Sequence, residues 1–162
     1  MPEALLYKEK DNTLYLRAEG HVTAALCADL RFIVFSRFDA APTVSAMYVD
    51  LSACTYMDST FMGLLVGFNK RLARTGAGKL KIVRPTTPAR ELLSGLGLLS
   101  LIEIVEEKVA FPADMDNVLK TQATGADLLL KAHENLMELS DENVKRFSTL
   151  HAVLKKQTEN KD

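Results

Sequence analysis

The chain is short of the residues that build metal sites and disulfide frameworks. Its 162 residues include two cysteines, Cys27 and Cys54, which form no Cys-x-x-Cys motif, and three histidines, His21, His133 and His151. The histidines lie far apart in the sequence, so neither a zinc site nor a disulfide framework is expected. We interpret the cysteines as small packed thiols in a reducing compartment, and the histidines as surface or helix-face residues without a catalytic role.

An excess of charge of one sign and long apolar runs are also lacking. The formal net charge is −1 and the isoelectric point is about 6.3, so the chain has no basic field for nucleic acid or an anionic membrane surface. No apolar segment approaches the roughly 18 residues of a membrane span, and the sequence does not open on a basic region followed by an apolar run. Neither direct DNA binding nor membrane insertion is expected, and the predicted location is the cytoplasm.

The motifs of common catalytic sites are missing as well. The sequence contains no Gly-x-Ser-x-Gly elbow, no His-Glu-x-x-His pair, no phosphate-binding Gly-x-x-x-x-Gly-Lys loop and no glycine-rich dinucleotide turn. No residue is therefore predicted to be catalytic, and neither a metal nor a cofactor is expected. These absences favour a binding protein over an enzyme.

The residues that are present predict one packed α/β domain with an appendage. Hydrophobic residues make up 48% of the chain and charged residues 25%, which is enough apolar material for a core. A hairpin followed by alternating helices and strands predicts a mixed sheet over residues 1–110, with helices mainly on one face. The expected strands span 4–9, 13–19, 44–51, 79–83 and 102–105, and the expected helices span 23–38, 59–74 and a segment from Thr87-Pro88 to Gly95.

Residues 111–162 are predicted to form a C-terminal helical extension without strands. Either Ser140-Asp141 caps the second helix of a hairpin or one long helix runs through this point, and Gly125 marks an earlier break. The apolar stripe is expected to pack back on the domain or against a second copy, which would form a homodimer. This stripe, at helical spacing apart from one wider gap, consists of Leu129, Leu136, Val144, Phe147, Leu150 and Leu154.

The stretch from Asp58 to Gly67 carries the clearest functional signal. It follows an apolar strand and a short expected loop that contains Cys54, and Asp58 is the predicted N-cap of the helix that begins at Ser59. The hydroxyls of Ser59 and Thr60 then lie at the first turn. Unpaired backbone N–H groups and the positive end of the helix dipole can hold a phosphate there, which is typical of a phosphorylation switch.

The same residues resemble the STAS domain family. Its anti-sigma-factor antagonists carry an Asp-Ser-Ser/Thr-Gly-Leu-Gly signature at the start of their second helix, and this chain reads Asp58-Ser59-Thr60-Phe61-Met62-Gly63 after Val49-Asp50-Leu51-Ser52. The resemblance covers roughly residues 4–110 and implies that Ser59 is the phosphorylated residue, with Thr60 as the secondary candidate. Phe61 stands where the family usually has glycine, and it places a large ring beside the acceptor.

The resemblance also implies a function. The chain would be an anti-sigma-factor antagonist, a regulatory binding module in a partner-switching pathway of transcription regulation. Its partners would be a serine-kinase anti-sigma factor and a phosphoserine phosphatase. Partner binding is expected at Ser59, Thr60, Phe61 and Phe68, with Phe61 or Phe68 partly exposed. Two alternatives remain open: a cytoplasmic STAS subunit of a lipid-transport ABC system, and a scaffold component of a stress-sensing assembly.

Overall fold

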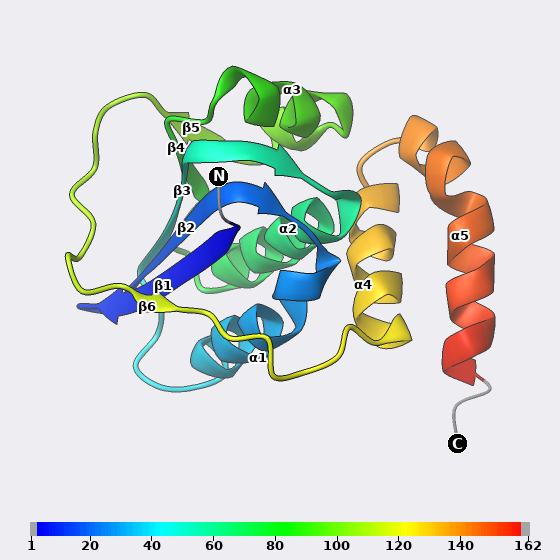
Figure 1. Ribbon diagram of the computed structural model, residues 1–162, viewed down its shortest axis with the longest axis horizontal. Coiled ribbons are helices and arrows are strands. Elements are labelled where there is room, and N and C mark those ends of the chain that lie inside the picture. The colour runs from blue at the N-terminus through cyan, green and yellow to red at the C-terminus, as the bar shows by residue number, and fades with distance from the viewer. Residues whose placement is uncertain (1–2, 160–162) are drawn as a thin grey trace.

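The hairpin, helix and strand signals of the sequence form one mixed sheet in a computed structural model that describes residues 3–159 (Figure 1). The strands of this range are β1 (Ala4–Lys10), β2 (Thr13–Val22), β3 (Ala46–Met57), β4 (Lys81–Val83), β5 (Glu103–Val105) and β6 (Asp116–Asn117). Its helices are α1 (Cys27–Phe38), α2 (Ser59–Arg74), α3 (Thr87–Gly95), α4 (Ala126–Met137) and α5 (Asp141–Glu159).

The strands follow the order β5-β4-β3-β2-β1-β6 across the sheet. β1 and β2 form an antiparallel hairpin, and its two turn residues, Asp11 and Asn12, have positive φ angles of 52° and 63°. From β2 to β5 all neighbouring strands are parallel, as crossover helices require. The mixed sheet expected from the chain order is confirmed.

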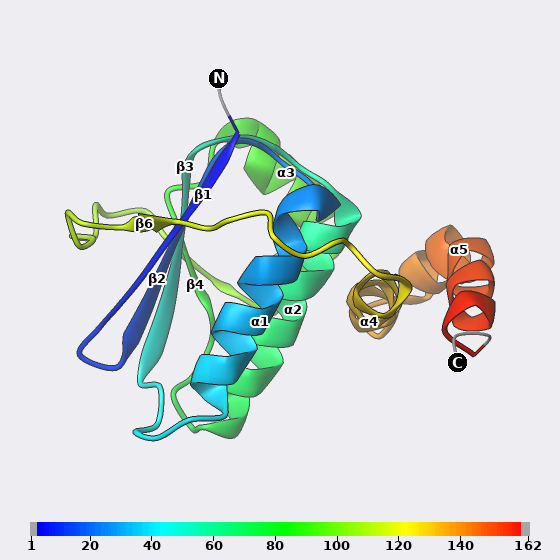
Figure 2. The ribbon, with the colours of Figure 1, turned by 60° about the horizontal axis from the view of Figure 1, so that its bottom comes forward.

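The helices form layers on one side of this sheet (Figure 2). α1 and α2 lie directly on the sheet, where alternate β2 residues such as Leu14 and Leu16 are fully buried. α4 lies outside α2, and α5 lies outside α4. On the other face of the sheet, Tyr15 stacks on Tyr48 at 5.8 Å, and Phe111 meets the Tyr15 ring edge-on.

Three local predictions from the sequence are wrong. β3 continues to Met57 because it pairs with β2 along its whole length, so Cys54 lies in a buried strand rather than in a loop. The sequence predicts Thr87 as the cap of α3 and Pro88 as its first helical residue. The cap is instead Thr86, whose hydroxyl accepts from the N–H of Ala89, so Pro88 is the second helical residue. Residues 111–162 do contain a strand, β6, which adds two residues to the free edge of β1.

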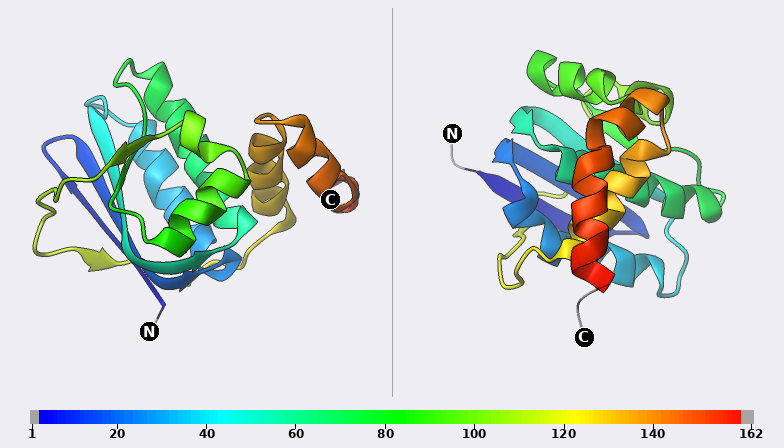
Figure 3. Two further views of the ribbon diagram at one scale, coloured as in Figure 1. Left: turned by 90° about the horizontal axis from the view of Figure 1, so that it is seen from above. Right: turned by 90° about the vertical axis from the view of Figure 1, so that its right-hand side faces the viewer.

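The extension forms the hairpin alternative. The Ser140 hydroxyl accepts from the N–H of Asn143 at 3.1 Å at the start of α5, which runs beside α4 (Figure 3). The stripe packs back on the domain, since Leu136, Phe147 and Leu154 are buried, but Val144 and Leu150 remain 41% exposed. The extension is therefore a layer of the same molecule.

Candidate functional site

The start of α2 is fixed by Asp58, the predicted cap. Its Oδ1 accepts from the N–H of Phe61 at 2.9 Å, which satisfies one of the free donors of the first turn. Its Oδ2 accepts from the N–H of Ala24 at 2.7 Å, at the 3-10 turn Ala24–Leu26 that leads into α1. Ser59 follows as the first helical residue, so the sequence prediction of its place is confirmed.

Ser59 is partly exposed, and α4 supplies a hydrogen-bond partner for its hydroxyl. The Oγ of Ser59 lies 2.8 Å from Nε2 of His133, and Nδ1 of the same imidazole lies 2.7 Å from the carbonyl oxygen of Leu129. A carbonyl oxygen only accepts, so Nδ1 carries a proton. In the neutral ring Nε2 is then the acceptor, and the Ser59 hydroxyl donates to it.

Of the two roles expected for His133, the surface role is wrong, whereas the helix-face role holds, because the side chain lies on the face of α4 that meets α2. The residue is only 2% exposed, and its ring meets that of Phe147 edge-on at 5.0 Å. Sequence reasoning missed the pair because Ser59 and His133 are 74 positions apart. The only available signal was the place of His133 beside the apolar positions of a predicted helix, and that signal indicates burial without naming a partner.

Gly63 allows α4 to approach α2 very closely. A Cβ atom added at Gly63 would lie 2.2 Å from the carbonyl oxygen of Ala132, a distance that no real side chain tolerates. The carbonyl of Gly63 also accepts from Nδ2 of Asn135 at 3.2 Å, and Oδ1 of Asn135 accepts from Lys70 at 3.0 Å. The glycine of the sequence signature thus forms the contact with the extension.

The expected exposure of Phe61 or Phe68 is wrong, since both side chains are fully buried. The expectation assumed that only the sheet covers α2. α4 supplies a second cover, so residues on both faces of α2 become core, and Phe68 also meets Phe35 of α1 edge-on at 5.4 Å. Thr60 is only 4% exposed, which leaves Ser59 as the partly accessible member of the expected partner-binding set.

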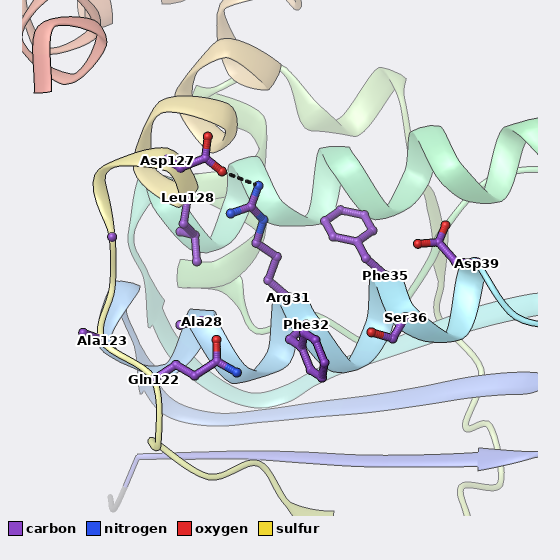
Figure 4. A pocket seen from close by; sticks show the side chains of 11 residues that line it. Ala28, Arg31, Phe32, Phe35, Ser36, Asp39, Gln122, Ala123, Asp127 and Leu128 are labelled. Carbon is purple, nitrogen blue, oxygen red and sulfur yellow. Dashed lines mark hydrogen bonds and ion pairs between the residues drawn. The ribbon is translucent and has the colours of Figure 1, made fainter. Parts of the chain in front are cut away.

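Several hollows border the extension. A cavity of about 380 Å³ between α3 and α5 is lined by Ser59, Leu92, Arg146 and Phe147 among others. A second hollow, of about 540 Å³, lies between α1 and residues 122–128, where Arg31 reaches Asp127 at the start of α4 (Figure 4). The second hollow contains no cysteine, histidine or paired carboxylates, so its lining offers little for catalysis.

Metal ligands and reactive thiols are the other groups that could act chemically in residues 3–159. Among these residues, no group of three or more histidine, cysteine, aspartate or glutamate side chains could hold a metal ion. Both cysteines are buried, and burial raises the pKa of the Cys54 thiol to about 11 and that of Cys27 further, so neither is a reactive thiolate. Within the same range no helix is both long and apolar enough to span a membrane.

Comparison with known proteins gives one family and several similar folds. The model of the STAS domain family matches residues 4–111. No curated protein sequence gives a significant match. The solved structure of the anti-sigma factor antagonist SpoIIAA in its unphosphorylated form is similar, with 19% identity, a TM-score of 0.56, and coverage of 64% of this chain and 90% of that chain.

Two further solved structures resemble the chain to a similar degree. SpoIIAA of Bacillus in its phosphorylated form has 19% identity and a TM-score of 0.53, with 64% of this chain and 93% of that chain covered. A putative anti-sigma factor antagonist from Thermotoga maritima has 20% identity and a TM-score of 0.54, with coverage of 62% and 85%. At these identities the likeness concerns the fold. The family match ends before α4. The helix whose His133 forms the hydrogen bond with Ser59 therefore lies outside the matched residues.

Proposed function

Because the chain belongs to the STAS domain family, we propose that it is an anti-sigma-factor antagonist switched by phosphorylation of Ser59. The observation that carries the proposal is the position of Ser59 at the first residue of α2, directly after the Asp58 cap. A serine-kinase anti-sigma factor would bind the unphosphorylated chain and then transfer phosphate to Ser59. A phosphoserine phosphatase would restore the binding form.

The site suits an acceptor better than an enzyme. The kinase supplies ATP, magnesium and the catalytic base, so the chain has only to present a hydroxyl. A phosphate on Ser59 would add roughly −1.5 to −2 charges at the positive end of the α2 dipole, which tolerates them in the free protein. A partner that docks against this point would have to bury the dianion, and we expect about a 100-fold or greater loss of affinity.

The test uses a serine-kinase anti-sigma factor, with ATP and Mg²⁺, and mass spectrometry to map the phosphate. Phosphate is expected on Ser59, not on the Ser59→Ala variant, and still on Ser59 in the Thr60→Ala variant. Ser59→Ala should bind the partner, and Ser59→Asp should bind it about 100-fold more weakly. Equal affinity of Ser59→Asp and the parent, with no phosphate on Ser59 or Thr60, would exclude the switch.

One observation favours a second candidate, a constitutive assembly subunit. The extension covers Ser59, which a switch requires to be accessible and a scaffold does not. Both alternatives, the STAS subunit of a lipid-transport ABC system and the scaffold component of a stress-sensing assembly, would bind their partners irrespective of Ser59. A stable complex with a transporter ATPase subunit that is unaffected by Ser59→Asp would support this reading.

A further inference from the structure

We propose that α4 occupies in cis the surface on which a partner must dock, so that the α4–α5 hairpin and the partner compete for the face of α2 around Ser59. This inference rests on the proposed function for the identity of the partner. It concerns residues 126–159, which the family match does not include. It also explains why the chain carries a helical layer over the very residues that the switch would use.

The acceptor hydroxyl of Ser59 already has a hydrogen-bond partner within the chain. Phosphoryl transfer requires the Ser59 oxygen to lie in line with the γ-phosphate at about 3 to 3.5 Å from the phosphorus. In this structure the Ser59 oxygen lies 2.8 Å from Nε2 of His133, so the imidazole stands where a reacting group would have to come. On its other side Ser59 borders a hollow of about 380 Å³ between α3 and α5, where it is partly exposed, and this hollow is far smaller than a protein domain.

α2 and α4 also pack closely against each other around Gly63. The Ala132 backbone enters the space that a side chain at Gly63 would fill, and Asn135 donates to the Gly63 carbonyl at 3.2 Å. Lys70 of α2 also pairs with Glu138, just past the end of α4. A partner that reaches the start of α2 would meet this same surface, so α4 and the partner exclude one another.

Hydrogen bonds also hold α4 at both of its ends. Before α4, the Thr124 hydroxyl donates to the carbonyl of Ala24 at 2.9 Å, and Asp29 accepts from the N–H of Gln122 at 2.8 Å. After α4, Nδ2 of Asn143 donates to the carbonyls of Leu136 and Leu96 at 2.8 and 2.9 Å. An opened α4 would therefore stay close to α2 and could close again when the partner leaves.

The test measures the accessibility of position 59 in the full chain without any partner. Ser59→Cys introduces a thiol whose labelling by a maleimide carried on a bulky dye is followed by mass, while the native thiols of Cys27 and Cys54 stay buried. Adding Gly63→Ala forces α4 away from α2, and Leu136→Ala weakens the α4 packing from the other side. We expect either change to speed labelling about tenfold or more.

The matched control is Gly95→Ala in the Ser59→Cys background. Gly95 is also helical, but an added Cβ meets no atom within 4 Å, so labelling should keep the parent rate. Circular dichroism and a cooperative thermal transition must show that each variant retains the folded domain. If Gly63→Ala does not fold, Leu136→Ala decides alone, because it leaves the residues of α2 unchanged.

The outcomes separate this inference from the proposed function. If the Ser59→Cys chain is labelled as fast without Gly63→Ala or Leu136→Ala as with either of them, the proposed competition is overturned, whatever the result with the kinase. With Ser59 intact, the opened variants should be phosphorylated about tenfold or more faster than the parent by the serine kinase. Faster labelling together with no phosphate on any variant would support the covering of Ser59 by α4 and contradict the proposed phosphorylation switch.

Discussion

Ser59 and His133 form a nucleophile–base pair by distance, but the surroundings of the imidazole disfavour catalysis. A general base becomes positively charged when it takes the serine proton, and a buried cation needs a negative partner. The ring instead has the Leu129 carbonyl on one nitrogen and the edge of Phe147 beside it. Among the described residues, the carboxylate nearest in sequence, Glu134, pairs with His151. The pair is therefore better suited to holding a hydroxyl than to activating it.

This reasoning predicts the absence of serine-dependent hydrolysis. The full chain should cleave an activated ester such as p-nitrophenyl acetate no faster than its Ser59→Ala and His133→Ala variants. The reason is that no carboxylate of residues 3–159 makes a hydrogen bond or ion pair with the His133 ring. Absorbance at the nitrophenolate band gives the rates, and equal rates are expected from pH 6 to pH 8 (about the range in which a histidine base usually gains its effect). A rate that falls about 100-fold or more in both variants would identify a catalytic pair instead.

Asp29 is a second residue whose charge matters, because it holds the segment that leads into α4. Its carboxylate accepts from the hydroxyl and N–H of Thr121 and from the N–H of Gln122, and the Thr121 bond is the main cause that lowers the pKa of Asp29. The folded state therefore binds this proton less readily than the unfolded chain. The resulting stability is present above the ordinary aspartate pKa of about 4 and is lost as the pH falls through the lowered pKa.

We therefore expect the stability difference between the parent and Asp29→Asn to depend on acid. Urea unfolding should show the parent more stable at pH 7, with a difference that shrinks steadily below about pH 4. Asp114→Asn is a control, since this exposed aspartate pairs with Lys8 only at the surface. A difference for Asp29→Asn that is constant from pH 7 to pH 3 would contradict the proposed role of its charge.

At the scale of elements, local signals in the sequence predicted most of the fold. The bounds of α2, Ser59–Arg74, agree with the expected 59–74 because the Asp58 cap and the apolar spacing both mark them. Features that depend on distant pairing were missed. The last residues of β3, Ser52 to Met57, give no clear strand pattern of their own, and they form a strand because β2 pairs with them. β6 likewise depends on the free edge of β1. The cover over Ser59 was likewise invisible, because helical periodicity does not identify the surface against which a helix packs.

Asn143 joins three of these elements and gives a direct test of how the hairpin is held. Its amide donates to the carbonyls of Leu96 and Leu136, its oxygen accepts from Arg146 at 2.9 Å, and the residue is 1% exposed. Asn143→Ala removes the donor to the Leu96 carbonyl, whereas the Leu136 carbonyl still accepts from the N–H of Leu139 at 3.1 Å. The free energy of unfolding should therefore fall by about 1 to 3 kcal/mol in urea titrations. The exposed Asn117→Ala is the control and should change it by no more than about 0.5 kcal/mol. Equal effects of the two substitutions would show that Asn143 does not anchor the hairpin.

At the scale of the whole molecule, the extension shares one hydrophobic core with the family domain. Val118, Leu128, Leu136 and Phe147 belong to the same buried cluster as the sheet and α2. The division into a domain of residues 1–110 and an extension of residues 111–162 remains a prediction about folding units. The family match to residues 4–111 concerns sequence, and it does not test whether the first unit is stable alone. What removal of residues 111–162 would change directly is the exposure of the α2 face that α4 covers.

We expect the full chain to be a monomer of 17.9 kDa, because the extension already covers the apolar face of α2 within one molecule. A chain ended after residue 110 should keep the strand and helix content of its own residues but expose that face, and exposed apolar patches of this kind drive association. Sedimentation velocity should then show a concentration-dependent increase in mass for the truncated chain, together with a lower thermal midpoint. Leu150→Ser in the full chain is the control for α5, since Leu150 is 41% exposed and would support a dimer formed through that helix. Two results would contradict the role of the extension as the intramolecular cover of α2. One is a full-length dimer that Leu150→Ser dissociates, and the other is a truncated chain that stays monomeric with an unchanged thermal midpoint.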